Sequence, residues 1–295
     1  MVDFAFFCII RAIMCFRVVF RWVFYIALFL FFSVLPGFAA DRIVSLTPVA
    51  TKEIFMLKKG RAIVGCSRYG VVPKGFKVKR VGSVVKADIE TILKLKPDIV
   101  IVSSLMNLND VKKMRSLGLN VVVFRQPKSF DDICNQMIRL AKLIHSEDIA
   151  NDIVKRARDM VFRIKKATEG LKKPKVFVQI GANPLFTAGG DSFINDFITF
   201  AGGINIASDV RSGIYSPAEV IRNNPDAIII SQMGFDGERQ AARWRRFAFL
   251  NAVKNNKILI LNDYSLCSPD PLSFAKTLLK IAKFLHPEVD FENLN

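Results

Sequence analysis

Histidine is nearly absent from this chain of 295 residues, and its scarcity limits the chemistry that the chain can perform. The only two histidines are His145 and His286, each close to the end of an expected helix. A zinc or manganese site built from side chains needs several such ligands, so we expect no intrinsic metal site. The chain also has no nucleophile elbow and no phosphate-binding glycine loop of either common type. We therefore predict that it is not an enzyme and has no intrinsic cofactor.

Cysteine is equally sparse outside the first 40 residues. Cys66, Cys134 and Cys267 are the three that follow them. An odd number leaves at least one free thiol, and the spacing does not resemble a disulfide framework. The default interpretation of each is a small buried hydrophobic residue.

Charge is scarce in the first 40 residues, which we interpret as a signal peptide. They contain Asp3, Arg11, Arg17 and Arg21, and the stretch from Trp22 to Leu35 has no charge. Basic residues, an apolar stretch and small residues before Ala39 are typical of a secretory signal cleaved after that residue. A start at Met14 gives a leader of the usual length. An uncleaved membrane anchor is the alternative, because the apolar run approaches the length of a bilayer span.

Positive charge dominates the rest of the chain. The formal net charge is +17, and +15 without residues 1–40, which carry three arginines and one aspartate. Such a field favours anionic ligands and surfaces, although solvated basic faces without a specific partner explain it equally simply. No nucleic-acid-binding signature is present, so we expect no nucleic-acid partner.

Two similar passages, about 130 residues apart, carry the strongest structural pattern. Residues 88–98 precede an aliphatic run at 99–103, and residues 216–226 precede another at 227–231. Each passage has an N-cap residue, Asp88 or Ser216, nine positions before a proline that ends the helix. Runs that are apolar at every position are typical of strands in parallel sheets covered on both faces. The chain is therefore predicted to contain two α/β lobes built on one plan.

The remaining pattern completes this fold class. We predict two Rossmann-like lobes with mostly parallel central sheets, joined by one long rigid helix. The first lobe covers residues 41–146 and the second residues 172–295. The linker helix covers residues 147–171, where apolar residues recur at helical spacing. A helix of about 24 residues would span about 36 Å.

Three segments resemble a known family. These are residues 42–51, residues 64–69 and the passage at 88–101, and they are similar to periplasmic substrate-binding proteins of the helical-linker class. Such proteins serve ABC importers of cobalamin, iron–siderophores and haem. Residues 175–189 and 202–205 look most like the vitamin B12-binding branch.

The resemblance implies roles for individual residues. Glu90 and Glu219 match the acidic residues, one per lobe, that dock onto the importer's membrane subunits. Helix capping is the alternative role, because Ser216 and Glu219 have the spacing of a capping box. Tyr69 and Tyr264 match loops that face the ligand. The further candidates for ligand contact are Arg68, Asp263 and Cys267. Cys66 and Cys267 are in loops expected to face each other. Each has two possible roles, a sulfur contact to a metal chelate or that of a small buried residue.

The departures from the family pattern bear on the ligand. Val84 stands where the cobalamin branch has a tryptophan, and Val72 stands where haem-binding members have a tyrosine. We predict a monomeric periplasmic receptor that passes a metal chelate, cobalamin first, to an ABC importer. An iron–siderophore or other anionic chelate is the alternative, supported by the net positive charge. A membrane-anchored or non-transport protein on the same fold is the alternative of a different class.

Overall fold

The structure is a computed structural model that describes residues 40–211, 213–232, 234–261 and 266–291. By their contacts, Ala40–Asn295 form one compact unit. The leader residues, and therefore the predicted signal peptide, lie outside the described residues.

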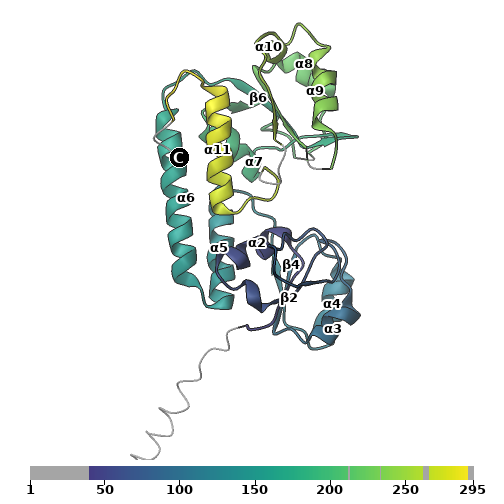
Figure 1. Ribbon diagram of the computed structural model, residues 1–295. Coiled ribbons are helices and arrows are strands. Elements are labelled where there is room, and N and C mark those ends of the chain that lie inside the picture. The colour runs from purple at the N-terminus through teal and green to yellow at the C-terminus, as the bar shows by residue number, and fades with distance from the viewer. Residues whose placement is uncertain (1–39, 212, 233, 262–265, 292–295) are drawn as a thin grey trace, which may run out of the picture. The chain divides into compact units, whose positions relative to one another are not determined.

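Two parallel sheets organise the described residues, in agreement with the predicted α/β class (Figure 1). The first has the order β3-β2-β1-β4-β5, with β1 (Ile43–Ser45), β2 (Ile63–Cys66), β3 (Lys79–Arg80), β4 (Ile99–Ser103) and β5 (Val121–Phe124). The second has the order β11-β10-β6-β9, with β6 (Lys175–Gln179), β9 (Ile204–Asn205), β10 (Ala227–Ser231) and β11 (Ile258–Leu261). A small antiparallel hairpin joins β7 (Gly181–Ala182) to β8 (Leu185–Phe186).

Helices surround both sheets. They are α2 (Pro48–Met56), α3 (Ile89–Leu95), α4 (Leu108–Ser116), α5 (Phe130–Ile144), α6 (Glu147–Ala167), α7 (Phe193–Phe200), α8 (Pro217–Asn223), α9 (Gly237–Arg245), α10 (Asn251–Lys254) and α11 (Pro271–Leu285), with a 3₁₀ turn at Gly60–Ala62. The two passages singled out in the sequence fold as predicted. Asp88 and Ser216 cap α3 and α8, and every residue of β4 and β10 is buried.

One hydrophobic core joins the inner faces of the two sheets. It combines alternate strand residues, such as Ile43 and Val178, with the buried faces of α2, α5, α6, α7 and α11. The opposite face of the first sheet packs against α3 and α4, and that of the second against α8, α9 and α10. Each sheet is therefore covered on both faces, as its unbroken apolar strands require.

Helix α6 is the element predicted to link the lobes. Its apolar stripe is buried at Ile153, Ala157 and Ile164, and α6 lies alongside α11 (Figure 1). It ends at Ala167, four residues before the predicted end at residue 171. The Thr168 hydroxyl binds the carbonyl oxygen of Ile164 at 3.2 Å and so closes the last turn.

Helices α9 and α10 are separate elements, divided by residues 246–250. Leu250 has an extended backbone (ψ 136°), and the break allows this residue to be fully buried. Strands β3 and β9 were not expected, because each has only two residues and no apolar run.

A charged cluster lies where α2 meets the start of α11. Asp270 caps α11, is 1% exposed, and its Oδ2 lies 2.6 Å from Nζ of Lys52 on α2. Burial alone would raise the pKa of Asp270, but the hydrogen bonds from Lys52 and Ser273 lower it. Beside this pair, Glu53 is 5% exposed, and burial, followed by the charge of Asp270, raises the pKa of its carboxyl well above the ordinary value. The contact between these helices therefore contains two buried carboxyls and one lysine.

Candidate functional site

Polar side chains gather at the carboxyl ends of the central strands in both sheets. Strands β1, β4, β6 and β10 end in Ser45, Ser103, Gln179 and Ser231, which are all buried. In the first sheet β1 and β4 are neighbours, and in the second β6 and β10 are neighbours. At these two positions the strand order reverses. Ligands of open α/β sheets bind outside the carboxyl ends at such a switch point, so each sheet has one candidate binding edge.

The buried polar residues hold the loops that leave these strands. Ser45 donates to the carbonyl oxygen of Thr47 at 3.1 Å and accepts from the Thr51 hydroxyl at 3.0 Å. In the second sheet, Gln179 donates to the carbonyl oxygen of Gly181 at 3.2 Å and accepts from Trp244 Nε1 at 2.8 Å. Satisfied buried hydrogen bonds make both loops well defined.

The turn after β2 carries Arg68 and Tyr69, two residues predicted to contact ligand. The amide of Gly70 donates to the carbonyl oxygen of Ser67 at 3.0 Å and closes the turn. The side chain of Tyr69 is 56% exposed, and Arg68 is exposed beside it. An exposed aromatic ring with a polar tip suits the face and edge of a flat ligand. The structure thus places both residues on one turn at the binding edge, and their contact with a ligand stays a prediction.

Arg80 is a residue of this region that the sequence reasoning missed. It lies on β3, where parallel pairing sets it opposite Cys66. Its Nη1 lies 2.9 Å from Cys66 Sγ, 2.8 Å from the carbonyl oxygen of Ser67 and 2.7 Å from that of Gly70. No sequence signal identified it, because the contacts depend on a two-residue strand. Its contacts make it part of the Tyr69 turn.

Cys66 lies beneath this turn and is fully buried. Burial raises the pKa of its thiol, although the neighbouring Arg80 opposes the shift. A Cβ added at Gly70 would lie 3.2 Å from Cys66 Sγ and 3.2 Å from Thr51 Oγ1. The backbone of Gly70 therefore lies closely over the thiol, as expected for a small buried residue.

The predicted ligand residues of the second lobe are only partly described. Asp263 and Tyr264 lie outside the described residues. Cys267 is half-buried, and its Sγ lies 3.4 Å from Oγ of Ser231 at the end of β10. Burial raises the pKa of the Cys267 thiol, and the contact with Ser231 opposes the shift. Cys267 therefore lies at the binding edge of the second sheet.

The two predicted docking glutamates occupy matching positions. Glu90 is in the first turn of α3, with 79% of its side chain exposed and Lys94 Nζ at 2.6 Å. Glu219 is in the first turn of α8, with 43% exposed and Arg222 Nη2 at 3.1 Å. Both helices pack on the sheet face opposite the shared core. Each carboxylate is thus paired with a cation of its own helix and remains accessible.

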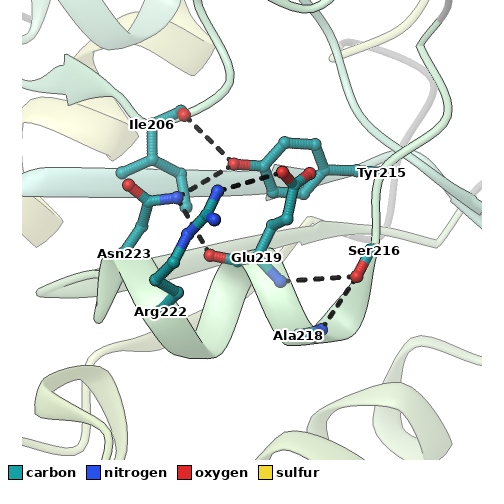
Figure 2. Close-up of polar contacts among 7 residues, drawn as sticks. All are labelled: Ile206, Tyr215, Ser216, Ala218, Glu219, Arg222 and Asn223. Atoms are coloured by element: carbon teal, nitrogen blue, oxygen red, sulfur yellow. Dashed lines mark hydrogen bonds and ion pairs between the residues drawn. The ribbon is translucent and has the colours of Figure 1, made fainter.

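The anchoring of α8 is visible in Figure 2. The Ser216 hydroxyl accepts from the amides of Ala218 and Glu219, which is the capping half of the predicted capping box. At the other end, Asn223 donates to the Tyr215 hydroxyl at 3.2 Å, and Tyr215 donates to the carbonyl oxygen of Ile206 at 3.3 Å. Burial and the charge of Glu219 raise the pKa of Tyr215, so it keeps its donated proton. The helix that carries Glu219 is therefore fixed at both ends.

Neither a metal site nor a membrane span is found among the described residues. Within the described ranges, no group of three or more histidine, cysteine or acidic side chains could hold a metal ion. In the same part of the chain, no helix is long and apolar enough to cross a bilayer.

The features to compare with known proteins are two parallel sheets with polar carboxyl ends of the central strands, and an acidic residue in the first turn of a helix packed on each sheet. Residues 43–264 match the model of the periplasmic binding protein family, and the chain belongs to that family. An uncharacterized ABC transporter substrate-binding lipoprotein, YvrC of Bacillus subtilis, is 26% identical over 228 residues, covering 74% of this chain and 71% of that protein. The vitamin B12-binding protein of Yersinia pestis is 26% identical over 214 residues, covering 71% and 76%. A crystal structure described as a possible iron-binding periplasmic protein of Staphylococcus epidermidis is similar with a TM-score of 0.73 and 25% identity, covering 84% and 99%.

Proposed function

We propose that this protein is a periplasmic receptor that captures a metal-containing chelate and delivers it to an ABC importer. Membership of the periplasmic binding protein family supports transport, and the B12-binding and possible iron-binding relatives support a metal chelate. Cobalamin is the first candidate ligand, because the segment at 175–189 resembles the B12-binding branch. The observation that carries the proposal is the pair of polar binding edges, one of which presents the exposed ring of Tyr69.

The proposed contacts divide between ligand and importer. Tyr69 and Tyr264 stack on the chelate or bond to its polar edge, with Arg68, Asp263 and Cys267 beside them. Glu90 and Glu219 bind arginines of the importer's membrane subunits, because carboxylates at two separate positions fix the orientation of a docked protein. The receptor acts as a monomer in the periplasm after export.

An anionic ferric chelate is the second candidate. Val84 is half-buried and provides a smaller contact than the tryptophan of the cobalamin branch. Arg68 and Arg80 are both exposed and close to Tyr69. Two guanidinium groups at the binding edge favour a negatively charged ligand.

Thermal unfolding of the purified chain with cyanocobalamin, ferric citrate and haemin tests the proposal. A ligand at a hundredfold excess over its dissociation constant stabilises the folded state by about 2.7 kcal/mol. We expect the melting temperature to rise with cyanocobalamin or ferric citrate and to stay unchanged with haemin, because Val72 replaces the tyrosine of haem-binding members. A chain whose melting temperature responds to no chelate would favour the non-transport alternative on this fold.

A further inference from the structure

Arg80 is connected to both ends of the turn that presents Tyr69. A single nitrogen, Nη1, contacts the thiol of Cys66, the carbonyl oxygen of Ser67 and the carbonyl oxygen of Gly70. The first two atoms lie where the chain leaves β2, and the third lies where the turn closes. The guanidinium group therefore holds the beginning of the turn to its end.

The backbone brings Arg80 to this position independently of its side chain. Strand β3 pairs in parallel with β2, and the amides of Val81 and Arg68 bond across the pair to the carbonyl oxygens of Cys66 and Gly82 at 2.9 and 2.8 Å. A guanidinium group is a charged donor, and charged donors form stronger hydrogen bonds than neutral ones.

One buried side chain of the turn adds no hydrogen bond to it. Ser67 is fully buried, and within the described part of the chain its Oγ has no hydrogen-bond partner. A buried hydroxyl without a partner is unfavourable, so it does not hold the turn in place. The contacts from Arg80 therefore add to the backbone hydrogen bonds of Ser67, Arg68 and Gly70 that hold the turn.

The other two nitrogens of the guanidinium group make no hydrogen bond or ion pair among the described residues. All three contacts of Arg80 there use Nη1, and the residue is exposed. The Nε and Nη2 donors are therefore available beside Tyr69. A guanidinium group recognises oxyanions such as carboxylates and phosphates.

We propose that Arg80 is a positioning residue of the binding site, which fixes the turn at residues 67–70 and receives an oxyanion of the bound chelate through Nε and Nη2. The ligand part of this inference rests on the proposed function. The oxyanion is the phosphodiester of cobalamin or a carboxylate of a ferric chelate, and the experiment below separates these sources.

The fixing of the turn is tested without any ligand. Amide hydrogen exchange at Arg68 and Gly70 is compared in the wild type, Arg80→Ala, Arg80→Lys and Lys79→Ala, the last being the exposed neighbour on β3. We expect exchange at both amides to be about tenfold faster in Arg80→Ala, because the turn opens locally. Lys79→Ala should behave as the wild type, and Arg80→Lys should fall between the two. Unchanged exchange in Arg80→Ala would overturn the proposal.

The oxyanion contact is tested with two pairs of ligands. Cyanocobalamin is compared with cobinamide, which lacks the phosphodiester, and ferric citrate with ferrichrome, which lacks free carboxylates. We expect Arg80→Ala to weaken binding of the oxyanion-bearing member of one pair by about tenfold more than its counterpart, with partial recovery in Arg80→Lys. Equal losses of affinity for both members of each pair would mean that Arg80 acts on the turn alone. This result would overturn the proposed contact between Arg80 and the oxyanion. If the wild type binds none of the four, the proposed function fails, and the exchange rates alone decide whether Arg80 holds the turn.

Discussion

At the scale of single residues, position in an element decided what the sequence could predict. Glu90 and Glu219 were singled out by the resemblance to the family, and the structure places both in the first turns of their helices. Arg80 was not identifiable, because its three contacts come from the pairing of β3 with β2. The polar strand ends, such as Ser45 and Gln179, did have a signal: one polar residue closes an apolar run.

Glu53 provides a residue-scale prediction on pH. Its carboxyl has a pKa raised by burial and by Asp270, so the folded state keeps the proton to a higher pH than the unfolded chain does. The contribution of Glu53 to the free energy of unfolding is therefore complete below the pKa of the unfolded chain, about 4.3. It is lost as the pH rises through the pKa of the folded state. Glutamine imitates the protonated form at every pH. We expect Glu53→Gln to match the wild type near the unfolded pKa and to melt at a higher temperature at neutral pH.

Thermal unfolding of both proteins across this pH range checks the prediction. Glu169→Gln is the control, since Glu169 is exposed beyond the end of α6. A wild type as stable as Glu53→Gln at neutral pH would show that Glu53 titrates normally.

At the scale of elements, long regular signals were predictable and short pairings were not. The units around α3 and α8 combine a cap, an apolar stripe, a proline and an aliphatic strand, and all four signals agree with one structure. β9 has two residues and is defined only by its partner β6. The break between α9 and α10 depends on burial of Leu250, which is a tertiary effect.

The helices α3 and α8 also lead to a prediction on transport. Glu90→Ala combined with Glu219→Ala should reduce uptake of the chelate about tenfold or more, because each change removes a charged partner from the docked complex. Ligand affinity should stay unchanged, since both helices pack on the sheet face opposite the shared core. Uptake in cells and titration of the purified variant measure the two effects separately.

Two exposed acidic residues, one on α6 and one just beyond its end, provide the control for that experiment. Asp152→Ala with Glu169→Ala removes the same charge from another region and should leave uptake unchanged. Loss of ligand affinity in the glutamate pair would show that these residues serve the binding site instead.

At the scale of the whole molecule, the α/β class and the parallel sheets were predicted correctly. The continuous core through α2, α5, α6, α7 and α11 was not, because it brings together segments more than a hundred residues apart. The contact of Lys52 with Asp270 and that of the Phe130 amide with Asp196 Oδ2 at 2.7 Å connect residues of the two predicted lobes. The two predicted lobes are therefore in direct polar contact besides sharing one core.

The central claim is that a metal chelate binds at the carboxyl ends of the strands in both sheets. Hydrogen exchange of the whole chain with and without the chelate that raises its melting temperature tests this claim most directly. We expect added protection at residues 66–70 after β2 and 180–186 after β6, and none at the first turns of α3 and α8. Protection confined to the outer helices, or none at either strand end, would contradict the account.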